Sequence, residues 1–563
     1  MPVRAEHPGR LVALIGAPAR ARPAALAGIP ARIPASRHLP APRHLPAPQH
    51  RLLLERRERL QPIATRGRVA HALLLALLIS LPGLAPATTH GGDSLPPQID
   101  ALLPELPLDP SQVSIYVRQV DSAVPLLAFN AEVARAPASV IKLVSSIAAL
   151  DLLGPEYQWS TEVYRVGPVA DGTLSGDLIL RGYGDPHLSN DAFAGLLRAL
   201  RAKGIDTIAG DLIIDESQLA PPSAGRYDFD GAGQSAYNAL PAALSLNRQA
   251  THLVIYHDRP SGRVGVYTDP PLSGVDLVND ATLVTAPCQA RHHRLNVQFS
   301  QPEGERPRLR VSGSFASECP DERVARLVLR PEQHAASAFD ALWRQLGGRI
   351  EGRIRLGSLP PAAVLVHRLE SPPLGEVLRD INKLSNNLAA RLVFLGLADQ
   401  DGPAPATLEQ ARARLATWLA ERGFEFPELF VDNGSGLSRE TRIAAASLGE
   451  LLVWSYHQPW MPELLGSMAI AGVDGTMRRR LRFEPIQGRA HLKTGTLRDA
   501  SGIAGYVLDA HGRRWVVVVL VNALPGTTLA AWHGHAVQHA LLRWVHAGAL
   551  RPAVAPDLSA ARD

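Results

Sequence analysis

Alternating and helical patterns of apolar residues divide the body of the chain into strands and helices. "VSIYVRQV" (113–120) and "VPLLAFN" (124–130) are typical of two strands joined by a polar turn. In "PASVIKLVSSIAALDLLGP" (137–155), apolar residues recur at helical spacing, Pro137 suits the first turn, and Gly154 ends the pattern. We therefore predict a strand pair followed by a helix.

The C-terminal part of the body mixes the same two patterns, whereas the middle part does not. Between 163 and 361, short β-rich segments such as "GDLILRG" (176–182) alternate with Pro/Gly turns. Helical spacing resumes in 374–398, 408–423 and about 528–546, and strand-like runs occupy 489–497, 502–510 and 514–522.

These patterns predict an α+β fold with a large insertion. We expect residues 100–162 and 362–548 to form one domain, an antiparallel sheet flanked by helices. Residues 163–361 would form a β-rich insertion of one domain or two nested domains. A chain of 563 residues, 46% of them hydrophobic, is long enough for several cores.

The first 87 residues differ in composition from the body. Residues 1–65 are rich in Pro, Ala and Arg and show no periodic apolar face, which predicts disorder, and we expect the same of the tail, 549–563. Residues 66–87 have the charged start, short apolar run and Ala-Pro-Ala end of a signal peptide. A retained membrane anchor is the alternative, although its apolar run is shorter than the ~20 residues that span a bilayer. In either case we expect export to the periplasm.

The net positive charge of the chain comes from this leader. Residues 1–87 hold 13 arginines and three acids, a net charge of +10, so the remainder contributes −5 to the total of +5. A folded body without a basic surface is not expected to bind nucleic acid. The run "RRRLR" (478–482) is typical of a solvated face, or of one that associates weakly with a membrane or with anionic wall polymers.

Two cysteines, Cys288 and Cys319, are the only ones in the chain. Export permits a disulfide, although two cysteines are too few for a disulfide scaffold or a zinc site. We expect them to pair, and two buried free thiols are the alternative. His535 and His539 lie four residues apart with no carboxylate or cysteine nearby, so we predict no metal site and no cofactor.

Lysine is scarce in this chain. Lysine and arginine total 58, but only four are lysines. Arginine keeps its proton in a protein, whereas a desolvated or cation-crowded lysine can become a neutral base. Ser139 lies three residues before Lys142, so on a helix the two share a face at the helix start, where backbone N–H groups favour an oxyanion. The pair predicts a serine nucleophile with a lysine base, and a helix with a solvated lysine is the alternative.

Two further lysines lie in or beside short polar motifs. Lys383 precedes "SNN" (385–387), and "KTG" (493–495) lies on a predicted strand. The order Ser-x-x-Lys, Ser-x-Asn, Lys-Thr-Gly resembles that of the active-site serine penicillin-recognising enzymes, which include penicillin-binding proteins and serine β-lactamases.

The spacing of the motifs is similar to that of one subgroup. Ser139 and Ser385 are 246 residues apart, which resembles the class C low-molecular-mass penicillin-binding proteins, D-alanyl-D-alanine carboxypeptidase/endopeptidases with a large insertion. The resemblance implies that residues 100–162 and 362–548 form a β-lactamase/transpeptidase-like domain. Arg248 departs from the pattern expected of an insertion loop in that family. Further similar stretches are 176–186, 237–247, 430–439 and 471–477.

The resemblance implies roles for the reacting groups. Ser139 attacks the carbonyl between two terminal D-alanines and Lys142 takes its proton. Lys493 lowers the pKa of Lys142 by like-charge repulsion. Ser385 relays a proton to the leaving amine, and the amide of Asn387 holds Lys142 and the substrate.

The resemblance also implies how substrate is bound. The backbone N–H groups of Ser139 and Thr496 form an oxyanion hole. Lys493 and Thr494 bind the substrate carboxylate, and Gly495 lets an edge strand lie close to the substrate because it has no side chain.

These features predict a serine-type D-alanyl-D-alanine carboxypeptidase/endopeptidase. It would act on peptidoglycan stem peptides and cross-links through an acyl-enzyme, and β-lactams would acylate it. A serine β-lactamase shares the motifs but needs a dedicated base for deacylation. The third possibility is a non-catalytic wall-binding protein on the same fold.

Overall fold

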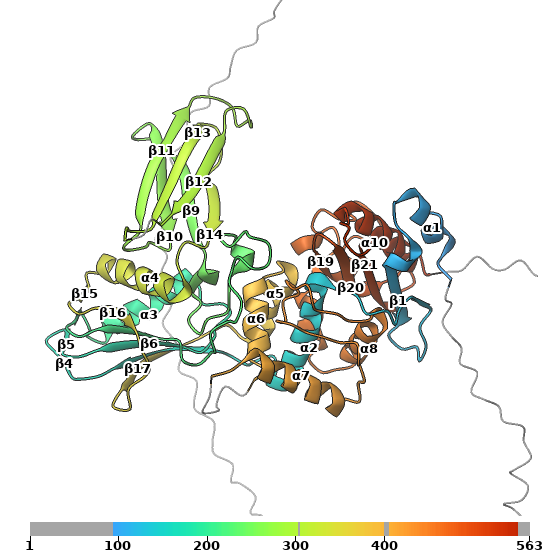
Figure 1. Cartoon of the computed structure of the whole chain (residues 1–563), viewed down its shortest axis with the longest axis horizontal. Helices are drawn as coiled ribbons and strands as arrows, with labels where there is room; N and C mark the ends of the chain where they lie inside the picture. The colour runs from blue at the N-terminus through green and yellow to red at the C-terminus, as the bar shows by residue number, and fades with distance from the viewer. Residues whose placement is uncertain (1–93, 302–303, 399–404, 550–563) are drawn as a thin grey trace, which may run out of the picture. The chain divides into compact units, whose positions relative to one another are not determined.

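The central sheet combines strands from both ends of the described chain. The computed structural model describes residues 94–301, 304–398 and 405–549, and the predicted leader (1–65), the signal peptide (66–87) and the tail beyond residue 549 lie outside them. Six antiparallel strands (Figure 1) follow in the order β18 (Ala469–Ile470), β19 (Ala490–Thr496), β20 (Ala500–Leu508), β21 (Arg514–Asn522), β1 (Val113–Gln119) and β2 (Leu127–Phe129).

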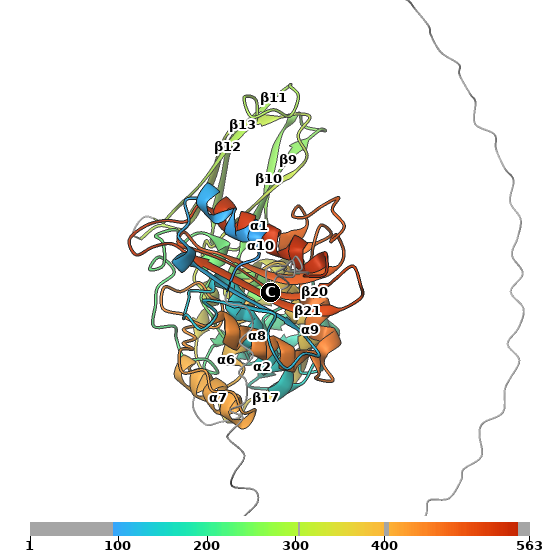
Figure 2. The ribbon, with the colours of Figure 1, turned by 90° about the vertical axis from the view of Figure 1, so that its right-hand side faces the viewer.

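Both faces of this sheet are covered by helices, which explains the unbroken apolar run of β21. One face packs against α8 (Ala445–Tyr456) and the other against α10 (Ala531–His546), as Figure 2 shows. Alternate residues of β21 therefore enter different cores, Val516, Val518 and Leu520 on the α8 side and Val517, Val519 and Val521 on the α10 side. A strand buried on both faces has no polar side to display.

Further helices extend the core on the α8 side. They share its buried cluster and are α2 (Lys142–Leu153), α5 (Leu374–Lys383), α6 (Asn387–Leu395), α7 (Leu408–Glu421) and α9 (Met461–Ser467). On the other side, α1 (Pro97–Asp100) packs against α10. A helix-covered antiparallel sheet confirms the predicted α+β class.

The helix predicted over 374–398 is wrong in one respect, because the structure has two helices there. Helix α5 ends at Lys383 and α6 begins at Asn387. Ser385 has a φ of 61°, in the left-handed region, and the Asn386 side chain caps α6 by accepting a hydrogen bond from Ala389 N at 3.2 Å. The apolar spacing continues across the break, so it gave no sign of the interruption.

The insertion leaves and rejoins the core through two paired strands. β3 (Ser160–Arg165) and β17 (Val364–Glu370) lie antiparallel in a five-stranded sheet of order β16-β8-β6-β3-β17. Helices α3 (Asn190–Ala202) and α4 (Pro331–Gln345) pack with its buried residues. The other strands of this part are β4 (Val169–Ala170), β5 (Thr173–Leu174), β6 (Leu178–Gly182), β7 (Thr207–Ile208), β8 (Leu212–Asp215), β15 (Arg349–Ile350) and β16 (Ile354–Leu356).

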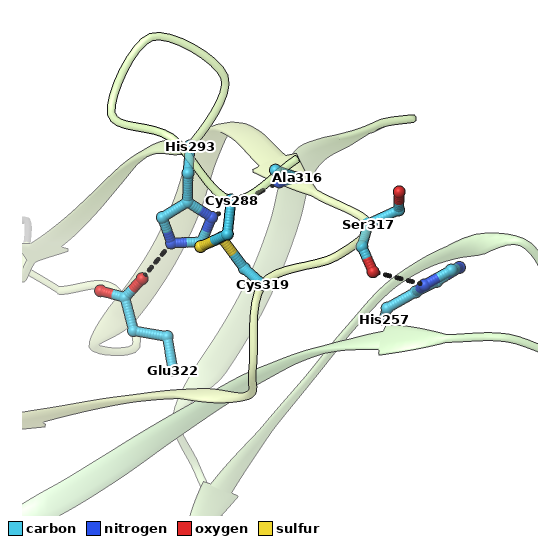
Figure 3. Close-up of a disulfide and its surroundings, with 7 residues drawn as sticks. All are labelled: His257, Cys288, His293, Ala316, Ser317, Cys319 and Glu322. Atoms are coloured by element: carbon cyan, nitrogen blue, oxygen red, sulfur yellow. Dashed lines mark hydrogen bonds and ion pairs between the residues drawn. A yellow bond between two sulfur atoms is a disulfide. The ribbon is translucent and has the colours of Figure 1, made fainter. Parts of the chain in front are cut away.

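Within the insertion, residues 251–326 form two three-stranded sheets around a core of their own. Their orders are β10-β9-β14 and β11-β13-β12, and their bounds are β9 (Thr251–Asp258), β10 (Arg263–Asp269), β11 (Asp276–Val284), β12 (Arg294–Ser300), β13 (Arg308–Ala316) and β14 (Glu322–Arg326). Cys288 and Cys319 are joined by a disulfide here, with Cα atoms 4.7 Å apart (Figure 3). Beside it, His293 Nε2 lies 2.6 Å from Glu322 Oε2.

In the described part of the chain, no helix combines the length and the apolar character needed to cross a membrane.

Candidate active site

Ser139 and Lys142 lie side by side, as their spacing predicts. Lys142 Nζ donates a hydrogen bond to Ser139 Oγ at 2.8 Å. The local structure differs from the expected first turn of an α-helix, because Ser139 lies in a 3-10 turn, η3 (Ala138–Ile141), and α2 begins only at Lys142. The turn follows Pro137 and has Ala138 at a φ of 48°. It presents the hydroxyl half-buried at the mouth of the site, above a fully buried amine.

The surroundings of Lys142 favour its neutral form. Its side chain is 0% exposed. Burial lowers the pKa of Lys142 well below its usual value, and the nearby charges of Lys493 and Arg391 lower that pKa further. The predicted cause, repulsion by Lys493, is therefore present but is second to desolvation.

Hydrogen-bond counting shows how the neutral amine can act as a base. Lys142 Nζ contacts Asn387 Oδ1 at 2.7 Å and the carbonyl oxygen of Ser435, in addition to Ser139 Oγ. A neutral amine has two N–H groups and one lone pair. If it donates to Asn387 and Ser435, the lone pair is directed to the hydroxyl proton of Ser139.

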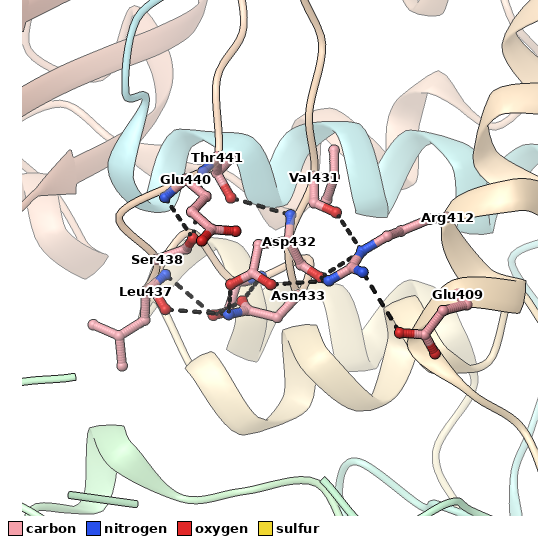
Figure 4. Close-up of polar contacts among 10 residues, drawn as sticks. Glu409, Arg412, Val431, Asp432, Asn433, Leu437, Ser438, Glu440 and Thr441 are labelled. Atoms are coloured by element: carbon pink, nitrogen blue, oxygen red, sulfur yellow. Dashed lines mark hydrogen bonds and ion pairs between the residues drawn. The ribbon is translucent and has the colours of Figure 1, made fainter. Parts of the chain in front are cut away.

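The Ser435 carbonyl belongs to the turn 433–436, and hydrogen bonds hold the chain on both sides of this turn in place. Figure 4 shows Arg412 of α7 donating to the carbonyl oxygens of Val431 and Asp432, each at 3.0 Å from Nε, and Asn433 donating to Leu437 O at 3.1 Å. The sequence "NGSG" (433–436) is typical of a turn. It gives no signal for the contact with Lys142, because every residue carries a carbonyl group.

The turn also needs glycine for a steric reason. Gly436 has a φ of 76°, and a Cβ added there would lie 2.0 Å from Ala138 O. The turn can therefore pack against η3, which carries Ser139, only because this position has no side chain.

Ser385 and Asn387 enter the site from the break between α5 and α6. Lys493 Nζ donates to Ser385 Oγ at 3.0 Å. Asn387 Oδ1 accepts from Lys142, and Asn387 Nδ2 donates to Tyr237 O of the insertion at 3.0 Å. Among the described residues, the second N–H of the Asn387 amide has no acceptor in hydrogen-bond range, so it can donate to a substrate carbonyl.

The Lys-Thr-Gly motif lies on β19, whose outer edge is open. β18 pairs only with His491 and Leu492, so no strand of the described residues lies beside the edge of β19 from Lys493 onward. Burial lowers the pKa of Lys493 to about 7. Thr494 Oγ1 donates to Thr476 Oγ1 at 2.8 Å, and Thr496 is exposed at the strand end.

Gly495 also has a steric role within the protein, beside the predicted one toward substrate. A Cβ there would lie 2.7 Å from both Pro137 O and Ser139 N, so the missing side chain lets β19 pack against the turn that carries the nucleophile. The steric need comes from the protein's own backbone.

A cleft of about 810 Å³ opens in front of these groups. Besides the motif residues Ser139, Ser385, Asn387 and Thr496, it is lined by Phe229, Asp230, Tyr237, Leu437, Arg439 and 497–499. Three of these residues, Phe229, Asp230 and Tyr237, come from the insertion, so the insertion forms one wall of the cleft. Asp230 Oδ2 accepts from the Tyr237 hydroxyl at 2.7 Å, and the Arg439 guanidinium lies 4.6 Å from the centre of the Phe229 ring. No recognisable motif marks Phe229 or Asp230 in the sequence.

The other sequence signals lie apart from the cleft chemistry. Lys383 Nζ forms an ion pair with Asp474 Oδ2 at 2.6 Å. His539 accepts from Arg480 Nε at 3.0 Å. Within the described ranges no group of histidines, cysteines and acids is arranged to hold a metal.

A serine hydroxyl hydrogen-bonded to a buried lysine amine, beside a strand edge, is an arrangement typical of serine hydrolases that work by acyl transfer. The comparison of sequences makes the assignment specific. The chain belongs to the D-Ala-D-Ala carboxypeptidase 3 (S13) family, whose sequence model matches residues 95–545. It is a serine-type DD-peptidase, which confirms the predicted enzyme class.

Individual relatives cover most of the chain. The D-alanyl-D-alanine carboxypeptidase DacB of Haemophilus influenzae is 25% identical over 414 residues, 73% of this chain and 85% of that protein. A D-alanyl-D-alanine carboxypeptidase of Actinomadura sp. (strain R39) is 27% identical over 455 residues, 78% of this chain and 83% of that protein.

A solved structure confirms the fold. Penicillin-binding protein 4 of Haemophilus influenzae, crystallised alone and in complex with a β-lactam, matches with a TM-score of 0.62 in both cases, at 23% and 22% identity. The match covers 80% of this chain and 99% of that protein.

Proposed function

We propose that this chain hydrolyses the peptide bond between the last two D-alanines of peptidoglycan stem peptides, and the corresponding D-alanyl bond in cross-links. The observation that carries this proposal is the buried Lys142 amine 2.8 Å from Ser139 Oγ. A lysine with a strongly lowered pKa can be neutral at physiological pH, as a general base must be.

In the first half of the reaction, Lys142 accepts the hydroxyl proton of Ser139 while Oγ attacks the D-alanyl carbonyl carbon. The negative charge that develops on the carbonyl oxygen is stabilised by the backbone N–H groups of Ser139 and Thr496, each such donor being worth ~3 kcal/mol. The proton on Lys142 then passes through the Ser385 hydroxyl to the leaving amine. The C–N bond breaks and leaves an ester on Ser139.

In the second half, water attacks that ester and gives up its proton to the same base. The acid is released and Ser139 regains its hydrogen. The carboxylate of the departing D-alanine would lie against Lys493 and Thr494 on the open edge of β19. Bound carboxylate favours the charged form of Lys493, whose pKa in the free protein is lowered to about 7.

β-Lactams should acylate the same serine. A strained cyclic amide presents its carbonyl to Ser139 as the D-Ala-D-Ala bond does, and a β-lactam complex is known for the Haemophilus influenzae protein of the same fold. We expect a long-lived penicilloyl adduct on Ser139.

The test uses Ser139→Ala and intact mass measurement. Wild-type protein should gain one penicilloyl group, and Ser139→Ala should gain none while its melting temperature stays near that of wild type. An adduct on the variant would show that another group is the nucleophile. Incubation of wild-type protein with monomeric and cross-linked muropeptides, followed by separation of the products, measures the carboxypeptidase and endopeptidase activities directly.

We also propose a periplasmic location with weak association of the protein with a membrane or with anionic wall polymers. The signal-peptide pattern at 66–87 supports export. Arg478, Arg479 and Arg482 are exposed beside Phe483, which is 84% exposed. Arg480 departs from the predicted solvated run, because it donates to Gln538 Oε1 at 2.7 Å and anchors the loop.

Cell fractionation checks the location, and sedimentation checks the association. Protein that stays in the supernatant with both anionic vesicles and isolated sacculi at low salt would contradict the association.

A further inference from the structure

Asp380 connects the insertion to the loop that carries Ser385 and Asn387. It lies on α5, five residues before Ser385, and its side chain is 8% exposed. One carboxylate oxygen, Oδ1, accepts from Arg248 Nη2 of the insertion at 2.6 Å. The other, Oδ2, accepts from Asn386 Nδ2 at 2.6 Å.

Asn386 is held at both ends of its amide. Its Nδ2 donates to Asp380, and its Oδ1 accepts from Ala389 N at 3.2 Å to cap α6. Because it stands between Ser385 and Asn387 in the chain, fixing Asn386 fixes both neighbours. The loop needs such support, since the left-handed backbone of Ser385, with a φ of 61°, is unfavourable for a residue with a side chain.

Arg248 lies in a turn that is closed by hydrogen bonds. Three consecutive residues, 247–249, have positive φ values between 48° and 58°. The turn is closed by Asn247 Nδ2, which donates to Ala250 O at 2.8 Å, and by Gln249 Nε2, which donates to Leu240 O at 2.5 Å. This hydrogen-bonded turn places the Arg248 guanidinium against Asp380, so the contact joins the insertion to α5.

We propose that Arg248 and Asp380 are positioning residues for acylation, through which the insertion holds the Ser385–Asn387 loop in its reactive geometry. Two short contacts depend on that loop, Lys493 to Ser385 at 3.0 Å and Asn387 to Lys142 at 2.7 Å. Without Arg248, the largely buried Asp380 loses its charged partner and its hold on Asn386 weakens. Displacement of reacting groups by ~1 Å can slow catalysis by ~100-fold.

The experiment measures acylation of Ser139 by a fluorescent penicillin, separated into the binding constant and the rate constant of the chemical step. Arg248→Ala should lower that rate constant by about 10-fold and leave the binding constant within about 2-fold. Arg248→Lys keeps the charge and should recover most of the rate. Asp380→Asn should slow acylation similarly, and adding Arg248→Ala to it should cause little further loss because the partner is already gone.

A matched control is available in α4. Arg344 Nε donates to Asp340 Oδ1 at 2.8 Å, and the pair resembles Arg248 and Asp380 in exposure, 68% and 10% for the two side chains against 48% and 8%. Arg344→Ala should leave acylation unchanged. Melting temperatures of all variants report any general loss of stability.

The proposal is overturned if Arg248→Ala and Asp380→Asn acylate at the wild-type rate, or if their effects multiply independently in the double variant. It is also overturned if Arg344→Ala slows acylation as much as Arg248→Ala does. It rests on the proposed peptidase function, whose failure would look different, because wild-type protein would then not be labelled at all. If Arg248→Ala does not fold, Arg248→Lys and Asp380→Asn still decide the matter.

Discussion

Replacement of Lys142 by arginine keeps the positive charge but removes the ability to lose it. The site is well suited to reveal the difference, because Lys142 is 0% exposed and lies among three oxygen acceptors. Lys142→Arg places a guanidinium there that stays protonated at every accessible pH. The hydroxyl of Ser139 then has no base.

The size of the effect follows from the protonation states. A lysine with an ordinary pKa of ~10.4 is neutral in about one molecule in 2,500 at pH 7, which corresponds to ~4.6 kcal/mol. Burial and neighbouring cations remove much of that penalty for Lys142. A general base contributes typically ~10²- to 10⁴-fold to a rate. We therefore expect Lys142→Arg to acylate at least about 10²-fold more slowly than wild type.

The assay is stopped-flow labelling with a fluorescent penicillin, with the melting temperature measured alongside. Lys203→Arg is the matched control, since Lys203 is exposed on the insertion and distant in role, and it should acylate normally. Acylation of Lys142→Arg within about 10-fold of wild type would refute the assignment of Lys142 as the base, because no arginine could have taken the proton.

Three further predictions follow from the site and the insertion. The acylation rate should rise with pH as Lys142 loses its proton, and fall above about pH 7 as Lys493 loses the charge that binds carboxylate. Lys493→Met should move the rising part of this profile to higher pH, because it removes a cation that lowers the pKa of Lys142. A rising part at the same pH in the variant would contradict that coupling. Gly495→Ala should slow acylation by at least about 10-fold, because its Cβ would lie 2.7 Å from Ser139 N; an unchanged rate would mean that the strand and turn can separate without loss. Cys288→Ser should lower the free energy of unfolding of the residues around the bond by up to about 3.7 kcal/mol, from the 31-residue separation of the cysteines, and leave acylation intact; a loss of labelling would show that the remote sheets influence the cleft.

The sequence predicted those parts of the site that depend on side-chain identity or on short spacing. Ser139 and Lys142 are three residues apart, so any helical turn brings them together. The run at 514–522 has no polar residue between Val516 and Val521, a pattern typical of a strand covered on both faces.

The parts that could not be predicted depend on backbone groups or on distant partners. The carbonyl of Ser435 carries no residue signature. Arg248 and Asp380 are 132 residues apart, and the sequence around neither residue indicates that they are in contact. The helix break at Ser385 has a local sign, since asparagine is a favoured N-cap residue, but the apolar spacing that runs through Asn386 hides it.

The position of β1 in the central sheet has a consequence for how the protein is made. β1 lies between β2 and β21, and Val113 is paired with Val521. During synthesis β1 therefore emerges early, while β21, the strand that pairs with it, appears about 400 residues later. The sheets of the insertion have cores of their own and can form in the interval. The domain that contains the six-stranded sheet is therefore the last to complete its fold.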